Sequence, residues 1–186
     1  MIRGLFTNLV ASRARVAKRL GALCLLILFG LFQLWGSLGL RINMSPSLPV
    51  GLYMTTADAS SPFVEFCPPE PYANLAITRG YRNVGSCPDG AAPHLKPVIA
   101  KAGDSVEVSA RGLAINGRLI RNTAAVRADT EGRPLAAWPS GRYQVDDGMV
   151  WVASSYHPRS FDSRYFGPIA TWRIRNHIQP LLTGGK

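Results

Sequence analysis

The sequence contains 186 residues, 47% of them hydrophobic, with 18 glycines, 14 prolines and a formal net charge of +10. This length accommodates one membrane anchor and one modest domain with its own core, and the glycine and proline content favours short strands over long helices. Because no basic run appears after residue 41, nucleic-acid binding is not expected. A basic surface near anionic lipid is the simpler interpretation of the charge.

The first element in the chain is an apolar run from Leu20 to Leu40 without a charged residue. At about 1.5 Å per helical residue, the run is long enough to cross roughly 30 Å of hydrocarbon. Five basic residues precede it, and only Arg41 follows it directly. The positive-inside rule therefore predicts a cytoplasmic tail over residues 1–19, a transmembrane helix over 20–40 and an exported domain over 41–186. A cleaved signal peptide is the alternative, but the run exceeds the usual apolar region of about 7–15 residues and no A-x-A site follows.

Short strand-like runs recur after Arg41, and no apolar pattern of helical period there is long enough to predict a helix. The runs cover Gly51–Thr55, Ala73–Thr78, Leu95–Lys101, Ser105–Val108, Leu113–Ile115, Arg118–Ile120, Gly148–Ala153 and Ile169–Ile174. Asn116-Gly117 between two apolar runs predicts a hairpin with a type I′ turn. Residues 57–71, 80–93 and 122–142 are predicted loops. The exported body is therefore predicted to be one mainly β domain of barrel or folded-sheet type.

The chain has three cysteines. Cys24 lies within the apolar run and is interpreted as a small hydrophobic residue. Cys67 and Cys87 lie in proline-flanked loop sequence, and no C-x-x-C or Cys/His cluster indicates zinc. If the body is outside the cytoplasm, a disulfide between Cys67 and Cys87 is favoured over two free thiols.

The motifs of common hydrolases and nucleotide-binding proteins are absent from the sequence. It has no G-x-S-x-G, H-E-x-x-H, glycine-rich phosphate loop or G-x-G-x-x-G. Its three histidines, His94, His157 and His177, lack the Ser and Asp context of a catalytic triad and are interpreted as ordinary surface or partly buried residues. No metal or cofactor is expected.

Three segments remain as candidates for chemistry. S-L-P-V-G-L-Y spans residues 47–53, K-P-V-I-A-K-A-G-D spans residues 96–104, and S-F-D-S-R-Y-F-G spans residues 160–167. In this order they resemble the serine, lysine and C-terminal boxes of the type I signal peptidase family, and more closely those of its conjugative-transfer branch, the TraF type. That branch carries an S-x-P-x-G-x-Y box behind a single anchor. The resemblance covers nearly the whole chain and implies a signal-peptidase-like folded β-sheet or barrel domain.

The resemblance implies a role for each matched residue. Ser47 is the expected nucleophile and Lys96 its general base, whereas Ser45 is expected to add its hydroxyl to the oxyanion hole. The other matched residues are expected to support the lysine and the shape of the site: Ser160, Asp162, Ser163 and Arg164. Either serine in this group is a candidate hydrogen-bond partner of Lys96. For Ser45 and Ser47, the plainer interpretation is a Ser/Pro turn that leaves the membrane. For Asp162, Ser163 and Arg164, it is a polar turn with an internal Asp–Arg pair.

The surroundings of Lys96 support the same role on physical grounds. A serine hydroxyl attacks an amide only if a base takes its proton, so the pKa of the lysine must fall from about 10.4 toward the working pH. Burial lowers the pKa of a lysine. Lys96 stands in apolar sequence, and no carboxylate follows it in the chain until Asp104. Lys101 is the competitor, but strand alternation directs it to the opposite face.

Two departures from the general family pattern bear on the function. An alignment on the proline of the family's S-M-x-P pattern would place Asn43 at the nucleophile position, and an amide cannot act as the nucleophile. The Gly-Asp-Asn-Arg stretch of general signal peptidases is replaced here by S-S-Y-H at residues 154–157. This replacement argues against housekeeping removal of export leaders.

The sequence therefore predicts a Ser/Lys endopeptidase of the bacterial inner membrane whose periplasmic domain processes membrane-inserted precursors. The TraF-type resemblance implies maturation of a pilin precursor for conjugation in a Gram-negative bacterium, by hydrolysis or by cyclisation. The alternatives are a general signal peptidase I and a non-catalytic, membrane-tethered β domain that binds a partner in a transfer apparatus.

Overall fold

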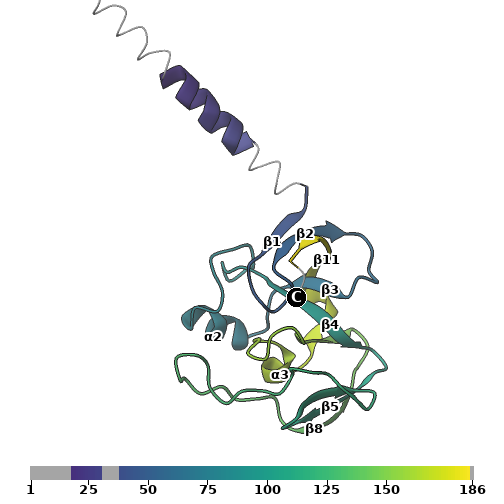
Figure 1. Cartoon of the computed structure of the whole chain (residues 1–186). Helices are drawn as coiled ribbons and strands as arrows, with labels where there is room; N and C mark the ends of the chain where they lie inside the picture. The colour runs from purple at the N-terminus through teal and green to yellow at the C-terminus, as the bar shows by residue number, and fades with distance from the viewer. Residues whose placement is uncertain (1–17, 31–37, 185–186) are drawn as a thin grey trace, which may run out of the picture. The chain divides into compact units, whose positions relative to one another are not determined.

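The computed structural model describes residues 18–30 and 38–184, and the chain divides into two compact units, Met1–Leu40 and Arg41–Lys186 (Figure 1). In the first unit, residues 18–30 form a helix with exposed side chains. Residues 1–17 of the predicted tail and 31–37 of the predicted membrane span lie outside the described residues. Among residues 18–30 and 38–184, no helix combines the length and the hydropathy that crossing a bilayer requires. Leu40, the last residue of the predicted span, is not helical but begins a strand.

The second unit is built on two β-sheets, which confirms the mainly β prediction. The larger sheet has the strand order β1–β2–β11–β3–β4–β9–β10. Its strands are β1 (Leu40–Asn43), β2 (Gly51–Thr56), β3 (Phe63–Phe66), β4 (His94–Lys101), β9 (Met149–Val152), β10 (Ile169–Ala170) and β11 (Ile174–Thr183). From β2 to β10 in this order, neighbouring strands are antiparallel.

The smaller sheet has the order β7–β6–β5–β8. Its strands are β5 (Ser105–Ser109), β6 (Gly112–Ile115), β7 (Arg118–Leu119) and β8 (Gly141–Gln144). The predicted hairpin is confirmed: Ile115 pairs with Arg118, and the two residues between them have positive φ, 50° at Asn116 and 82° at Gly117. Positive φ at both central positions is the requirement of a type I′ turn.

Residues Ala73–Thr78, predicted as a strand, form helix α2 (Tyr72–Thr78), so this prediction is wrong. Alanine and leucine are strong helix formers, and Ala73 and Ala76, one turn apart, are the residues that the helix buries. Gly80, with a φ of 71°, stops the helix, and its N–H donates to the carbonyl of Ile77 at 2.9 Å. A short apolar run without flanking context does not distinguish a buried strand from a one-sided helix.

The strand predicted over Ile169–Ile174 is also corrected. It divides into β10, the 3₁₀ helix η1 (Thr171–Arg173) and the first residue of β11. Strand β3 lies inside the predicted loop 57–71, and β1, β8 and most of β11 were not predicted. Strand β11 pairs with β2 and β3, which lie far from it in the chain, so the contacts that stabilise it are not visible in its local sequence. Helix α3 (Ser163–Phe166) was not predicted either.

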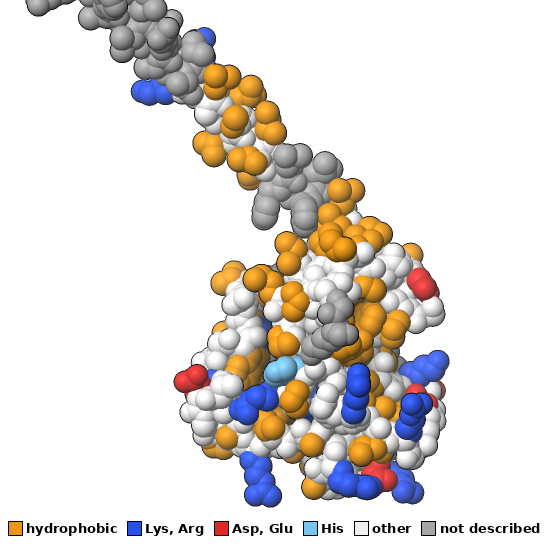
Figure 2. All heavy atoms as spheres, in the orientation of Figure 1, with side chains coloured by type: hydrophobic (Ala, Val, Ile, Leu, Met, Phe, Trp, Pro, Cys, Tyr) orange, Lys and Arg blue, Asp and Glu red, His pale blue; other side chains and the backbone are white. Residues whose placement is uncertain are grey.

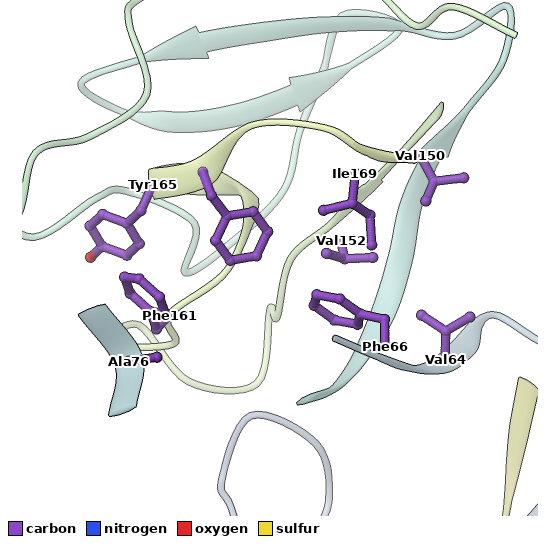
Figure 3. Close-up of a cluster of buried hydrophobic side chains, with 9 residues drawn as sticks. Val64, Phe66, Ala76, Val150, Val152, Phe161, Tyr165 and Ile169 are labelled. Carbon is purple, nitrogen blue, oxygen red and sulfur yellow. The ribbon is translucent and has the colours of Figure 1, made fainter. Parts of the chain in front are cut away.

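Three clusters of buried side chains hold the second unit together. The first joins β3, β9, β10, α2 and the α3 segment (Figure 3), through Val64, Phe66, Ala76, Val150, Val152, Phe161, Tyr165, Phe166 and Ile169. The second joins β9 to the smaller sheet, through Ala100, Val106, Val108, Leu113, Val145, Trp151 and Ala153. The third consists of Leu48 of the β1–β2 loop, Tyr53 of β2 and Ile178 of β11. Leu48 directly follows Ser47, so burial of Leu48 fixes the loop that carries the predicted nucleophile.

Candidate active site

The loop between β1 and β2 is organised by the side chain of Asn43. This residue is only 4% exposed, and its amide nitrogen donates to the carbonyls of Ser45, Leu48 and Pro49 at 2.9, 3.1 and 3.0 Å. Its side-chain oxygen accepts from the N–H of Ser45 at 3.2 Å. The two N–H groups of the amide, shared among three carbonyls, and the one bond that its oxygen accepts therefore set the path of the chain on both sides of Ser47.

Ser47 is buried within this loop, with 6% of its surface exposed. Its hydroxyl donates to the Ser160 hydroxyl at 3.1 Å, across 113 positions of sequence. Its N–H donates to Ser45 Oγ at 3.3 Å. The two groups expected to form the oxyanion hole thus lie beside each other, although in this structure they bond to one another. The Ser45 side chain is on the exposed part of the loop.

Lys96 enters the same region from β4, where it lies opposite Val64 of β3, and it is 4% exposed. Burial lowers the pKa of Lys96 to about 8, while the charge of Asp162 opposes this shift and the charge of Arg164 adds to it. A larger share of the Lys96 amines is therefore neutral near neutral pH than for an exposed lysine. Lys101, at the other end of β4, is exposed, in agreement with the strand alternation.

Asp162 and Arg164 form an ion pair that is completely buried, with side chains 0% and 1% exposed. Arg164 Nε donates to Asp162 Oδ1 at 2.8 Å and Arg164 Nη2 to Asp162 Oδ2 at 3.1 Å. The remaining guanidinium hydrogens reach the carbonyls of Asn122, Pro158 and Ser154. Asp162 Oδ2 also accepts from the N–H of Ser154 at 3.0 Å. The segment is therefore a buried network that holds residues 154–158 in place, rather than a solvated polar turn.

The two serines of this segment have different surroundings. Ser160 lines the same cavity as Ser47 and Lys96 and bonds to the Ser47 hydroxyl. Ser163 is also buried, but its hydroxyl accepts from the N–H of Val152 at 2.9 Å. Ser163 thus stabilises strand β9, and Ser160 is the serine that lies against the predicted nucleophile.

The cavity that contains Ser47, Lys96 and Ser160 has a volume of about 500 Å³, within the usual range of ligand pockets. It is walled by the β1–β2 loop, the start of β4, both ends of the 80–93 loop and parts of residues 126–165. His94 and His157 line it, whereas His177 lies by another depression. Within residues 18–30 and 38–184, no group of three or more His, Cys, Asp or Glu residues is arranged to hold a metal ion.

A disulfide joins Cys67 to Cys87. It connects the end of β3 to the 80–93 loop, and that loop leads directly into β4 and Lys96. The third cysteine, Cys24, has a free, exposed thiol in the helix of residues 18–30. The disulfide therefore restrains one wall of the cavity rather than the loop that carries Ser47.

The sequence profile of the family described as "Signal peptidase, peptidase S26" matches residues 13–181 of this chain. The chain belongs to this family. It is 38% identical to a plasmid transfer protein TraF of Escherichia coli over 148 residues, 78% of this chain and 83% of that protein. It is 39% identical to a probable conjugal transfer protein TraF of Sinorhizobium fredii over 152 residues, 78% of each protein. These relatives place the chain in a TraF-type group of the signal peptidase family.

A crystal structure of a signal peptidase I from Enterococcus faecalis is similar to 66% of this chain and 98% of its own, with 20% sequence identity and a TM-score of 0.37. This similarity is too weak to carry an argument about the site. The assignment to the signal peptidase family therefore depends on the family profile and on the TraF-type relatives.

Two features of the site were not predicted from the sequence. One is the role of Asn43, which was considered only as an excluded nucleophile. A signal for it exists, because an Asn that follows a strand and precedes a Ser/Pro turn is typical of side-chain capping of that turn. The other is the bond between Ser47 and Ser160, for which no local signal exists because only the fold brings the two residues together.

Proposed function

We propose that the chain is a membrane-anchored serine endopeptidase in which Ser47 is the nucleophile and Lys96 the general base. The observation that carries this proposal is that both side chains are buried and line one cavity, where the pKa of Lys96 is lowered to about 8. A buried lysine with a lowered pKa in the same cavity as a buried serine suits nucleophilic catalysis without histidine.

The proposed reaction proceeds through an acyl-serine. The Ser47 hydroxyl, which donates to Ser160 Oγ in the structure, passes its proton to the neutral amine of Lys96, and Ser47 Oγ bonds to the scissile carbonyl carbon. The C–N bond then breaks, and the leaving amine takes the proton from the Lys96 ammonium. A water molecule or the substrate's own N-terminal amine attacks the ester in the second half of the reaction and releases a hydrolysed or cyclised product.

The oxyanion that forms in each step needs hydrogen-bond donors. The N–H of Ser47 and the hydroxyl of Ser45 are the proposed donors, and they are adjacent in the loop. Their mutual bond of 3.3 Å is long, so a substrate oxygen can replace it at small cost. A donor of this kind contributes about 10²–10³ in rate.

The proposed setting is the bacterial inner membrane, with residues 1–19 cytoplasmic, 20–40 as the anchor and 41–186 periplasmic. Figure 2 shows hydrophobic side chains gathered over the end of the second unit that holds β1 and β2. Ile42, Met44 and Val50 belong to β1 and the β1–β2 loop, and Leu182 belongs to β11 and pairs with β2; these four residues are from 52% to 84% exposed. Ile42 and Met44 also line the cavity. An apolar surface at the mouth of the cavity supports a site that works against lipid.

The proposed substrate is a membrane-inserted, pilin-like precursor. The names of the relatives, plasmid transfer and conjugal transfer proteins, support a role in conjugation over general removal of export leaders. Hydrolysis and cyclisation share the acyl-serine, so the mass of the product distinguishes them: a cyclised product is lighter by one water than the hydrolysed one.

Co-expression with candidate pilin precursors tests the proposal. We expect the wild-type chain to convert the precursor, and Ser47→Ala and Lys96→Met to abolish conversion, since loss of a nucleophile or its base lowers the rate by about 10⁴-fold or more. Ser60→Ala and Lys101→Met, which alter exposed residues of the same unit, are the matched controls. Conversion that is unchanged in Ser47→Ala would refute the catalytic assignment and favour a non-catalytic partner-binding domain.

A further inference from the structure

His94 begins strand β4, two residues before Lys96. Alternation along a strand places residues i and i+2 on the same face, about 7 Å apart. The imidazole ring stacks on Phe66 with ring centres 5.8 Å apart and an interplanar angle of 30°. A second ring, Phe161, lies with its centre 6.4 Å away. The ring of His94 is therefore held in one orientation beside the proposed base.

One nitrogen of this ring, Nε2, is buried and has no hydrogen-bond partner among the described residues. Folded proteins bond nearly all of their buried polar atoms because an unbonded one costs free energy, so an exception calls for a physical reason. Folding alone offers none here, since a phenylalanine would make the same ring contacts without the unbonded nitrogen.

His94 lines the cavity that contains Ser47 and Lys96, so a small displacement of the atoms that cover Nε2 lets a group in this cavity bond to it. Burial lowers the pKa of His94 well below its usual value, and the positive charges of Lys96 and Arg82 lower it further. The imidazole is therefore neutral at physiological pH. A neutral imidazole has one nitrogen that donates and one that accepts, so it can bond a hydroxyl or an amide of an entering chain.

We propose that His94 is a specificity-determining residue, whose Nε2 forms a hydrogen bond with a polar side chain of the substrate next to the scissile bond. His94 is two residues before Lys96 on β4, so the bond forms close to the scissile bond. A short side chain suits this position, and the chemical class is therefore a small hydroxyl-bearing residue, serine or threonine. This inference rests on the proposed peptidase function. It adds that one position beside the cut is selected by hydrogen bonding and not by size alone.

The test uses the purified full-length protein and synthetic peptides that span the cleavage site determined by mass spectrometry of the co-expression product. At each of the three positions on either side of the cleaved bond, alanine is compared with serine and valine with threonine. These pairs isolate the hydroxyl from the size of the side chain. For the wild-type protein we expect one position at which the hydroxyl raises kcat/KM by about tenfold or more, as for a site built to bond it.

The informative variant is His94→Phe, which keeps the stacked ring and removes the nitrogen. We expect the preference for the hydroxyl at that position to fall to about onefold, while the preferences at the other positions persist. His94→Gln, which restores a hydrogen-bonding group, is expected to regain part of the preference. His157→Phe makes the same substitution elsewhere in the cavity and is expected to keep the wild-type ratio. A thermal unfolding curve for each variant verifies that it is folded.

A wild-type protein that cleaves the peptides without a hydroxyl preference at any position would overturn the inference and leave the proposed function intact. A preference that is unchanged in His94→Phe would overturn it as well. If the wild-type protein and Ser47→Ala are equally inert toward every peptide and every precursor, the proposed function fails, and the inference fails with it.

Discussion

Lys96 is the residue at which the demands of folding and of chemistry are opposed. Its burial in β4 lowers its pKa to about 8 from 10.5, and this shift is what makes the amine a base near neutral pH. The same shift means that holding the charged form inside the fold is unfavourable. Activity and stability therefore depend on pH through one group, and each dependence has a sign that can be measured.

Activity is expected to rise with pH. Only the neutral amine accepts the Ser47 proton, so kcat/KM should increase about tenfold per pH unit below pH 7 and level off above the Lys96 pKa of about 8. The measurement is the pH profile of peptide cleavage between about pH 5.5 and 9.5. A flat profile across pH 6–8 would contradict Lys96 as the base.

Lys96→Met is expected to abolish activity and also to stabilise the fold. The folded-state pKa lies below the unfolded value of 10.5, so burial of the charge destabilises the protein fully below about pH 8, and this cost disappears as the pH rises toward 10.5. At pH 7 we expect a gain of about 2–4 kcal/mol in the free energy of unfolding, because the pKa falls from 10.5 to about 8 and each pKa unit corresponds to roughly 1.4 kcal/mol. Urea unfolding of the wild type, Lys96→Met and Lys101→Met measures it, and a loss of stability in Lys96→Met alone would contradict the prediction.

Asn43 acts through the loop and not on the substrate. In Asn43→Asp, the carboxylate cannot donate to the carbonyls that the amide now holds, so the loop should shift and displace Ser47. A displacement of about 1 Å costs roughly 10²-fold in rate, and we expect it in kcat with little change in KM. Tyr53→Phe, which removes only one bond to the Pro49 carbonyl, is the milder comparison. Equal losses in the two variants would argue against a special role for Asn43.

At the scale of elements, the site depends on segments that reach it from distant parts of the chain. The β1–β2 loop supplies Ser47, β4 supplies Lys96, and the segment before α3 supplies Ser160. The buried Asp162–Arg164 pair connects this last segment to residues 122 and 154–158. Helix α3 is too short to be stable alone, and Asp162 caps its first turn by accepting from the N–H of Arg164.

Arg164→Lys is expected to destabilise the second unit by about 3–5 kcal/mol. A lysine ammonium cannot make both bonds to the Asp162 carboxylate and still reach three carbonyls, so buried acceptors would be left unbonded. Arg142→Lys is the control, because its pair with Glu107 is exposed and should contribute less than about 1 kcal/mol. Chemical denaturation at pH 7 compares the two, and similar values for both would contradict the structural role of the buried pair.

At the scale of the whole molecule, the proposal places one chain in three environments: cytoplasm, lipid and periplasm. The basic residues before Leu20 and the apolar surface around Ile42, Met44, Val50 and Leu182 support that order. The five basic residues before Leu20 account for half of the formal net charge of +10.

Protease accessibility tests the topology. In intact spheroplasts, added protease should digest the domain of residues 41–186 and spare an epitope tag placed before residue 1, because the positive-inside rule keeps the basic tail in the cytoplasm. The protein should stay with the membrane pellet after alkaline carbonate extraction. A domain that is protected until the spheroplasts are lysed would contradict the periplasmic assignment.

The sequence by itself determined the features that depend on neighbouring residues. The Asn116–Gly117 turn follows from backbone sterics, and the opposite exposure of Lys96 and Lys101 follows from strand alternation. The order and spacing of the three matched segments identified the family. Each of these features can be inferred without knowing which residues are in contact in the tertiary structure.

Only the tertiary structure decided the features that depend on partners distant in the chain. Ala73–Thr78 contains good helix formers but is too short for its sequence alone to decide between helix and strand, and the burial of Ala73 and Ala76 on one face accompanies the helix. The contact of Ser47 with Ser160, the complete burial of the Asp162–Arg164 pair and the unbonded nitrogen of His94 arise from packing between segments. Burial and hydrogen-bond satisfaction are properties of the folded environment, so no local pattern of residues contains them.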